Sequence, residues 1–197
     1  FNSGKIDQAR EISSEILHEQ PKNFQNLNLL AIILFKQKKF DQSINLIKNS
    51  LDINPNQADT QNNLGLMYIE LKKISDAVKC FKESIKINPK FLEAYNNLGI
   101  ALREIKDNEN ALKIRKEALS INENNPQIYN NIGNLLTETN YEKKAVEYYE
   151  KAINLKKNYD LARLPYAFCT ATHPQTVPFW LPFRSLCCHF FSTKMSA

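Results

Sequence analysis

Apolar residues recur at three- and four-residue spacing in short segments along most of the chain. The first two series are Leu27, Leu30, Leu34 and Ile44, Ile47, Leu51. This spacing puts the apolar side chains on one face of an α-helix. Asn54-Pro55 and Asn88-Pro89 mark two helix ends, because proline disfavours helical geometry in the residue before it. The pattern therefore predicts consecutive pairs of short helices, and Pro126 is expected as the first residue of one of them.

A sequence repeat organises these helices. The tetrapeptide Asn62-Asn63-Leu64-Gly65 returns as Asn96-Asn97-Leu98-Gly99 and as Asn130-Asn131-Ile132-Gly133, each time after 34 residues. In rows of 34 residues that start at Phe24, the small residues of position 8 are Ala31, Gly65, Gly99 and Gly133, and those of position 20 are Ser43, Ala77, Ala111 and Ala145. A mid-helix glycine costs about 1 kcal/mol relative to alanine. Its return predicts a neighbouring helix too close for a methyl group.

Across residues 24–157 the columns match the pattern W-x-x-L-G-x-x-Y, A-x-x-x-F and P, so the chain resembles the tetratricopeptide repeat family. The resemblance implies an all-α fold, a right-handed α-solenoid of about four and a half helical hairpins followed by an irregular tail. The expected divisions are a partial repeat with only its second helix (1–23), four repeats (24–57, 58–91, 92–125, 126–159) and the tail (160–197).

Two places depart from the repeat pattern. In the third row Asn108, Arg115 and Glu123 replace two apolar residues and a proline, so its second helix is expected to pack most loosely. We interpret Arg115 as packing its stem while its guanidinium reaches water; the other interpretation pairs it with an acidic residue of a partner. In the fourth row Tyr141 stands one place early relative to Ala145, which predicts a turn that differs by one residue.

The resemblance also implies a binding site, because positions 2, 5, 6, 9, 12 and 13 of each repeat of this family usually face the concave groove. The candidate peptide-binding residues are Asn28, Asn62, Asn63, Asn96, Asn97, Asn130, Asn131, Asn134, Lys36 and Arg103. A carboxamide can donate and accept hydrogen bonds, so it binds a peptide backbone in either polarity. Neighbouring helices lie ~8–10 Å apart and an extended chain advances ~3.3 Å per residue, so successive repeats would meet every third ligand residue.

A column of asparagines of this kind resembles the tetratricopeptide superhelix of the O-linked N-acetylglucosamine transferases, in which asparagines hold polypeptide substrates. A second interpretation is that the asparagines at position 6 serve only hydrogen bonding between helices. We therefore expect a scaffold that binds a protein or peptide partner. The alternative is that the repeats recruit substrates for a larger enzyme, of glycosyltransferase or sulfotransferase type, whose catalytic domain is absent from this chain.

Composition argues against nucleic-acid binding and catalysis. Residues 1–158 carry 23 Lys and Arg against 20 Asp and Glu, a net charge of +3 that is dispersed over the helices. A nucleic-acid interface needs clustered basic residues, so we expect no nucleic-acid partner. The repeats contain no acid pair, no nucleophile with a base, no phosphate loop and no zinc motif, so we expect no enzymatic activity, cofactor or metal. Cys80 is the single cysteine of the repeats. A lone thiol is compatible with a reducing compartment, so we expect a cytoplasmic location.

The two ends of the chain carry further expectations. Pro165 is expected to prevent a full fifth hairpin, with Leu161, Leu164 and Phe168 at most covering the exposed end of the repeats. The tail has three interpretations: a zinc site that includes Cys169, membrane contact through Phe179, Trp180 and Leu181 with lipidated Cys187 or Cys188, or an unpacked extension. At the other end no preceding helix covers Ile6, Ala9, Ile12 and Ile16, so we also expect self-association there. Because the chain starts with Phe1 inside a repeat, we expect a fragment of a longer protein.

Overall fold

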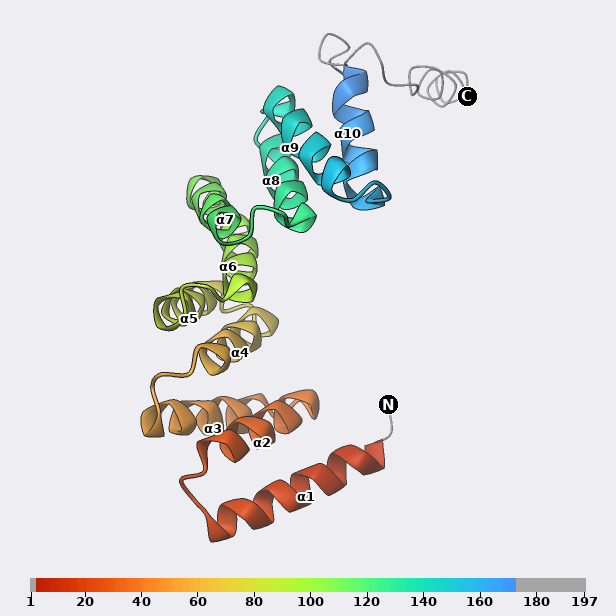
Figure 1. Cartoon of the computed structure of the whole chain (residues 1–197). Coiled ribbons are helices and arrows are strands. Elements are labelled where there is room, and N and C mark those ends of the chain that lie inside the picture. The colour runs from red at the N-terminus through yellow and green to blue at the C-terminus, as the bar shows by residue number, and fades with distance from the viewer. Residues whose placement is uncertain (1–2, 173–197) are drawn as a thin grey trace. The chain divides into compact units, whose positions relative to one another are not determined.

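A computed structural model describes residues 3–172, and helices are the regular elements of that part (Figure 1). The prediction of an all-α fold is confirmed. The chain divides into two compact units between Asp107 and Asn108. The division falls inside the third row of the repeat, the row in which Asn108 and Arg115 replace apolar residues.

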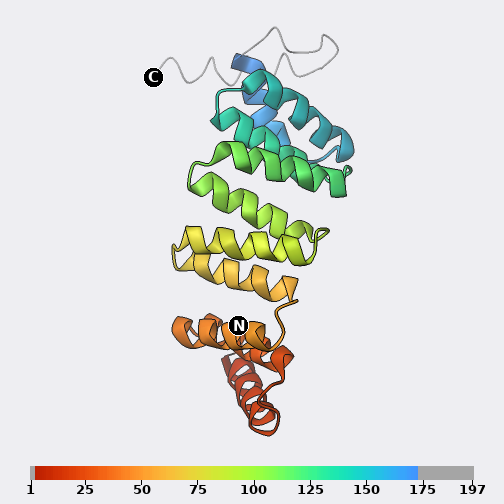
Figure 2. The ribbon, with the colours of Figure 1, turned by 90° about the vertical axis from the view of Figure 1, so that its left-hand side faces the viewer.

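Unit 1 runs to Asp107 and contains helical hairpins preceded by a single helix. Its helices are α1 (Ser3–Glu19), α2 (Phe24–Lys36), α3 (Phe40–Ile53), α4 (Ala58–Glu70), α5 (Ile74–Ile87) and α6 (Leu92–Glu104). Figure 2 shows them running back and forth in antiparallel order. Unit 2 contains α7 (Asn108–Ile121), α8 (Pro126–Glu138), α9 (Glu142–Leu155) and α10 (Asp160–Thr172).

The helix ends follow from the local sequence. α3 ends at Ile53 and α5 at Ile87, each one residue before an Asn-Pro pair, because the residue before proline leaves helical geometry. Pro126 is the first residue of α8, as predicted, and the side chain of Asn125 accepts a hydrogen bond from the amide of Gln127. These caps satisfy backbone groups that the helix cannot pair internally.

The turn inside each hairpin has the same geometry in all four rows. Its residue in the left-handed region is Lys38, Lys72, Lys106 or Asn140, with φ between 60° and 62°. The next amide donates to a carbonyl five residues earlier, as from Lys73 to Tyr68 at 2.8 Å and from Tyr141 to Leu136 at 2.8 Å. This bond is that of a Schellman C-cap. The prediction of a different turn in the fourth row was wrong, because the backbone bonds set the turn whichever side chain stands at Tyr141.

The small residues of position 8 lie directly against the facing helix of their own hairpin. A Cβ atom added to Gly65 would lie 2.5 Å from Cε1 of Phe81, and one added to Gly133 would lie 2.5 Å from Cε1 of Tyr149. Both distances are far shorter than a van der Waals contact, so the prediction of a close approach is confirmed at these two glycines. The first row has Ala31 in place of glycine, and there position 24 is the smaller Ile47.

Serine hydroxyls join the open ends of two hairpins. Ser50 donates to the carbonyl of Phe24 at 3.2 Å, and Ser84 donates to the carbonyl of Ala58 at 2.7 Å. The two bonds occupy the same place in successive rows, since both serines stand at position 27 and both carbonyls at position 1. Ser84 is fully buried, so this bond satisfies a group that water does not reach.

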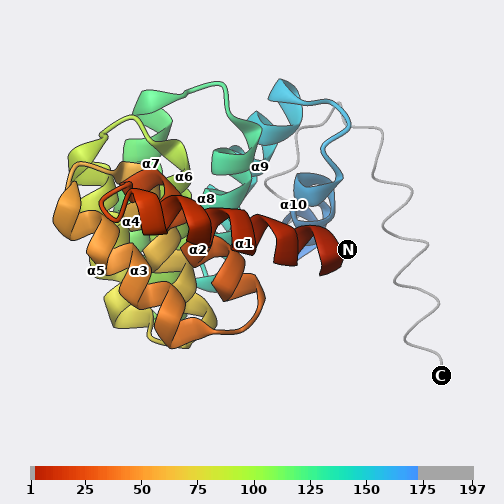
Figure 3. The same cartoon turned by 90° about the horizontal axis from the view of Figure 1, so that it is seen from below.

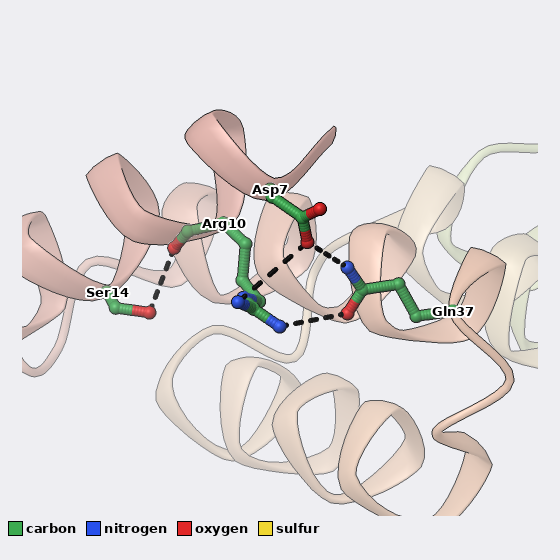
Figure 4. Close-up of polar contacts among 4 residues, drawn as sticks. All are labelled: Asp7, Arg10, Ser14 and Gln37. Carbon is green, nitrogen blue, oxygen red and sulfur yellow. Dashed lines mark hydrogen bonds and ion pairs between the residues drawn. The ribbon is translucent and has the colours of Figure 1, made fainter. Parts of the chain in front are cut away.

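At the N-terminal end of unit 1, α1 packs against α2 (Figure 3). The side chain of Asn26 donates to the carbonyl of the buried Ser13 at 2.6 Å. Figure 4 shows a second contact near the end of α2, where Gln37 donates to Asp7 at 3.0 Å and accepts from Arg10 at 3.5 Å. Ile12 and Ile16, on another side of α1, are 56% and 36% exposed.

The C-terminal end differs from the expectation. Residues 160–172 form α10 although Pro165 lies inside it. Proline removes one backbone hydrogen bond, and the helix still forms because it buries Ala162 and Cys169 completely. The expectation that Leu161, Leu164 and Phe168 cover the end of the repeats was also wrong, since these side chains are 62%, 79% and 55% exposed.

Arg115 on α7 also differs from the prediction. Its side chain is 4% exposed, so the guanidinium does not reach water as we had expected. A buried guanidinium needs hydrogen-bond acceptors to offset its lost hydration, and Arg115 takes part in interactions within the structure.

Candidate functional site

The first helix of each hairpin presents one face that its partner helix does not cover. Successive residues of an α-helix rotate by about 100°, so positions 2, 5, 6, 9, 12 and 13 of a row share one side. We call this side the first-helix face. In unit 1 it is formed by α2, α4 and α6, and α4 packs directly against α6. In unit 2 it is formed by α8 and α10, which also contact each other.

In unit 1 the asparagines of positions 5 and 6 have different surroundings. Asn62, at position 5 of α4, is 2% exposed, whereas Asn63 and Asn97, at position 6 of α4 and α6, are half-buried. The side-chain amide of Asn97 donates to Oδ1 of Asn62 at 2.9 Å. Asn62 therefore holds the carboxamide of Asn97 in place from the neighbouring repeat. One N–H of Asn97 is used in this bond, and the carboxamide has a second N–H and a carbonyl oxygen.

Asn28 belongs to the junction between the first two repeats. Its side-chain amide donates to Oε1 of Gln57 and to Oγ1 of Thr60, both at 2.8 Å. Gln57 is itself buried and donates to the carbonyl of Ser50 at 3.0 Å. Asn28 thus connects α2 to the start of α4, and its amide group is committed to the fold.

In unit 2 the predicted asparagines are also divided between burial and partial exposure. Asn130 is 4% exposed, and Asn131 and Asn134 are half-buried. Oδ1 of Asn134 accepts the hydroxyl of Tyr149 at 2.9 Å, and that hydroxyl lies 3.1 Å from Oγ1 of Thr137. Burial raises the pKa of Tyr149 to about 12, so the phenol stays protonated and donates to Asn134. Asn131 takes part in an interaction within the structure as well.

The three other predicted residues lie in unit 1. Lys36, in the last turn of α2, is exposed. Asn96 and Arg103 on α6 are half-buried, and each takes part in an interaction within the structure. The structure thus brings Asn62, Asn63 and Asn97 together, while it uses Asn28 and Asn134 for contacts that hold helices to one another.

The candidate peptide-binding residues did not include the exposed apolar side chains of the first-helix face. In unit 1 these are Leu29, Leu66 and Ile100, which are 50%, 40% and 40% exposed. In unit 2 they are Leu161, Leu164 and Phe168 of α10, at positions 2, 5 and 9 of a fifth row. The column of position 9, which contains Leu66, Ile100 and Phe168, is the signal that could have found them.

Of the tail residues named for a zinc site or a membrane contact, Cys169 lies in the described part of the chain. Cys169 is buried, and its Sγ lies 3.6 Å from Oγ1 of Thr137. Phe179, Trp180, Leu181, Cys187 and Cys188 lie outside the described residues. Among the residues that the structure describes, no group of three His, Cys, Asp or Glu side chains could hold a metal ion. None of the helices in that part combines the length and the apolar character needed to cross a membrane.

Comparison with solved structures identifies close relatives of the fold. A crystal structure of MamA has a TM-score of 0.72 and 20% sequence identity, over 79% of this chain and 91% of that chain. MamA from Desulfovibrio magneticus RS-1 has a TM-score of 0.70 and 17% identity, over 80% and 89%. YrrB, a tetratricopeptide repeat protein with an unusual peptide-binding site, has a TM-score of 0.69 and 15% identity, over 82% and 84%. At these identities the similarity concerns the fold alone.

Comparison with known sequences agrees with the repeat pattern. No curated protein matches this chain. Models of the tetratricopeptide repeat family match residues 58–91, 80–113 and 126–159. The first of these segments contains α4 and α5, and the last contains α8 and α9. With the hairpins, the left-handed turns and the close glycine contacts, these matches show that the chain is a member of the tetratricopeptide repeat family.

Proposed function

We propose that this chain is a protein-interaction scaffold that binds a peptide segment along its first-helix face. The observation that carries the proposal is the pair of half-buried asparagines Asn63 and Asn97 in unit 1, together with the bond from Asn97 to the buried Asn62. A carboxamide that is held in place presents hydrogen-bonding groups to a peptide backbone without demanding a particular side chain.

The spacing of the helices supports an extended ligand. Packed helices lie ~8–10 Å apart, and an extended peptide advances ~3.3 Å per residue. The carboxamides of α4 and α6 would therefore meet backbone groups about three ligand residues apart. YrrB, which has a similar fold, is a tetratricopeptide repeat protein with a peptide-binding site, and this likeness also favours a peptide as the ligand.

Substitution of the asparagines at position 6 distinguishes their two interpretations, as residues that bind a peptide and as residues that only join helices. In one variant Asn63, Asn97 and Asn131 are all changed to alanine. Selection of peptides from a random phage-displayed library on the purified full chain supplies ligands, and fluorescence anisotropy then measures their affinity. We expect each lost hydrogen bond to weaken binding about fivefold. Loss of the bond from Asn97 to the buried Asn62 should lower the free energy of unfolding by about 1–2 kcal/mol and leave the chain folded.

The control is Asn49→Ala, which removes an exposed asparagine of α3 away from the first-helix face. It should leave both affinity and stability unchanged. The proposal is wrong if the triple variant binds the selected peptides as tightly as the unchanged chain. It is also wrong if the triple variant unfolds, because the three asparagines would then serve the fold.

A further inference from the structure

The first-helix face of unit 1 combines carboxamides with apolar side chains. Leu29 on α2, Leu66 on α4 and Ile100 on α6 are 50%, 40% and 40% exposed. Single exposed aliphatic residues are common on soluble proteins. Here each of three first helices contributes one, and all three lie on the face that contains Asn63 and Asn97. A patch of this kind is typical of an interaction site.

Carboxylates flank this patch at both ends of two helices. Asp59 and Glu93 lie in the first turns of α4 and α6, and Glu70 and Glu104 are the last residues of the same helices. All four are exposed. Within the part of the chain that the structure describes, none of the four makes an ion pair. Glu70 and Glu104 also face the negative end of their helix dipoles, so they gain most from a nearby cation.

The first-helix face of α4 and α6 has fewer basic than acidic side chains. On α4 and α6 the only cation at these positions is Arg103, which is half-buried and already engaged within the structure. Lys36 belongs to α2. The equivalent positions of α8 in unit 2 contain Gln127, Asn134 and Glu138, with no aliphatic residue among them. The combination of apolar centre and acidic ends is therefore present on α4 and α6 and absent from α8.

We infer that the first-helix face of unit 1 selects peptide segments in which aliphatic side chains are accompanied by lysine or arginine. This inference rests on the proposed peptide-binding function and names the class of ligand. Burial of the ligand's aliphatic groups against Leu29, Leu66 and Ile100 supplies apolar contact. The carboxylates attract the basic groups and repel acidic segments, and this repulsion excludes wrong partners.

The first test compares two peptides on the full chain. Both are fluorescein-labelled and twelve residues long, with leucine at every third position; one has lysine at intervening positions and the other has glutamate there. We expect the lysine peptide to bind at least about tenfold more tightly. Its affinity should fall by severalfold when the salt concentration rises from low to high, because the flanking charges are exposed and salt screens them.

The second test uses substitutions with matched controls. Leu66→Ser with Ile100→Ser should weaken binding of the lysine peptide about tenfold or more. The control Ile12→Ser removes an even more exposed aliphatic side chain of α1 and should not change this affinity. Glu70→Gln with Glu104→Gln should reduce the preference for lysine over glutamate peptides. Asp52→Asn, an exposed site on α3, should not affect that preference. The charge variants keep the shape of the side chains, so their result does not depend on the fold tolerating a serine.

The results separate failure of this inference from failure of the proposed function. If library-selected peptides bind and the lysine and glutamate peptides bind equally, the inferred ligand class is wrong and peptide binding stands. If neither designed peptide binds and the library yields no ligand, both are wrong. Loss of affinity in the Ile12→Ser control would place the apolar contact on α1 and overturn the inference as well.

Discussion

The contact between Gly65 and Phe81 makes the effect of one methyl group predictable in sign. Gly65→Ala adds a Cβ that would lie 2.5 Å from Cε1 of Phe81 and 2.8 Å from two further ring atoms. Phe81 is completely buried, so its ring cannot turn into solvent to make room. Overpacking of this kind costs about 1–3 kcal/mol, and alanine recovers about 1 kcal/mol of helix propensity. With three ring atoms in conflict, we expect a net loss of about 1–2 kcal/mol.

The first repeat indicates how to reverse that loss. Its equivalent pair is Ala31 with Ile47, and both are completely buried. Phe81→Ile by itself leaves a void above Gly65 and should cost about 2 kcal/mol. In the Phe81→Ile background, Gly65→Ala fills part of the void and restores helix propensity, so it should stabilise the chain. Gly65→Ala should therefore destabilise the chain that contains Phe81 and stabilise the Phe81→Ile variant.

Chemical denaturation followed by far-UV circular dichroism measures all four members of this cycle. We expect a coupling free energy of at least about 2 kcal/mol between the two positions, within the range known for residues in contact. Asp52→Asn, on the exposed side of α3, serves as a control that should not shift the denaturation midpoint. Additive effects of the two substitutions would refute the reasoning, because they would mean that the ring moves aside at no cost.

Three further predictions concern the turns, a buried phenol and a buried thiol. Lys72→Gly should raise the free energy of unfolding by about 0.5–1 kcal/mol, because Lys72 has φ 60° and glycine adopts that geometry without strain. The control Lys73→Gly, where φ is −92°, should not raise the free energy of unfolding in the same denaturation experiment. Tyr149→Phe should lower the free energy of unfolding by about 1–2 kcal/mol, because it leaves Oδ1 of Asn134 without its donor. In thermal melting the control Tyr141→Phe, at an exposed site, should show no loss of stability. Burial raises the pKa of Cys80 to about 11. At pH 8 iodoacetamide should therefore alkylate Cys80 about a hundredfold more slowly than in the unfolded chain, as measured by mass spectrometry. Equal rates in the folded and unfolded chains would contradict the burial of this thiol.

The fold could be predicted from the sequence wherever a column of the repeat reports a contact. Position 8 is small because position 24 of the same hairpin lies against it, as the pair Gly65 and Phe81 shows. Pro126 and the two Asn-Pro pairs mark helix ends because proline restricts the backbone locally. The turn at Asn140 could not be predicted from Tyr141, because backbone hydrogen bonds alone define it.

The C-terminal helix and the site were harder to predict, since both depend on tertiary packing. Pro165 disfavours a helix locally, and tertiary packing, including the burial of Ala162 and Cys169, offsets that cost. Asn62 and Asn63 are neighbours of the same residue type, yet Asn62 is buried and Asn63 is only half-buried. That difference follows from how α4 packs on α6, which no single residue encodes. The apolar members of the face were missed because exposure, unlike residue type, is decided by packing.

The hydrogen bond from Asn97 to Asn62 has a consequence for the entropy of binding. A free asparagine side chain samples several rotamers, and holding such a group in a complex costs about 0.5–1.5 kcal/mol. In this protein the bond across the two repeats restricts Asn97 before any ligand arrives, so most of that cost is met when the chain folds. Folding stability and ligand affinity are thereby coupled: a substitution that releases Asn97 leaves its donors in place and still weakens binding, because the ligand must then order the side chain itself.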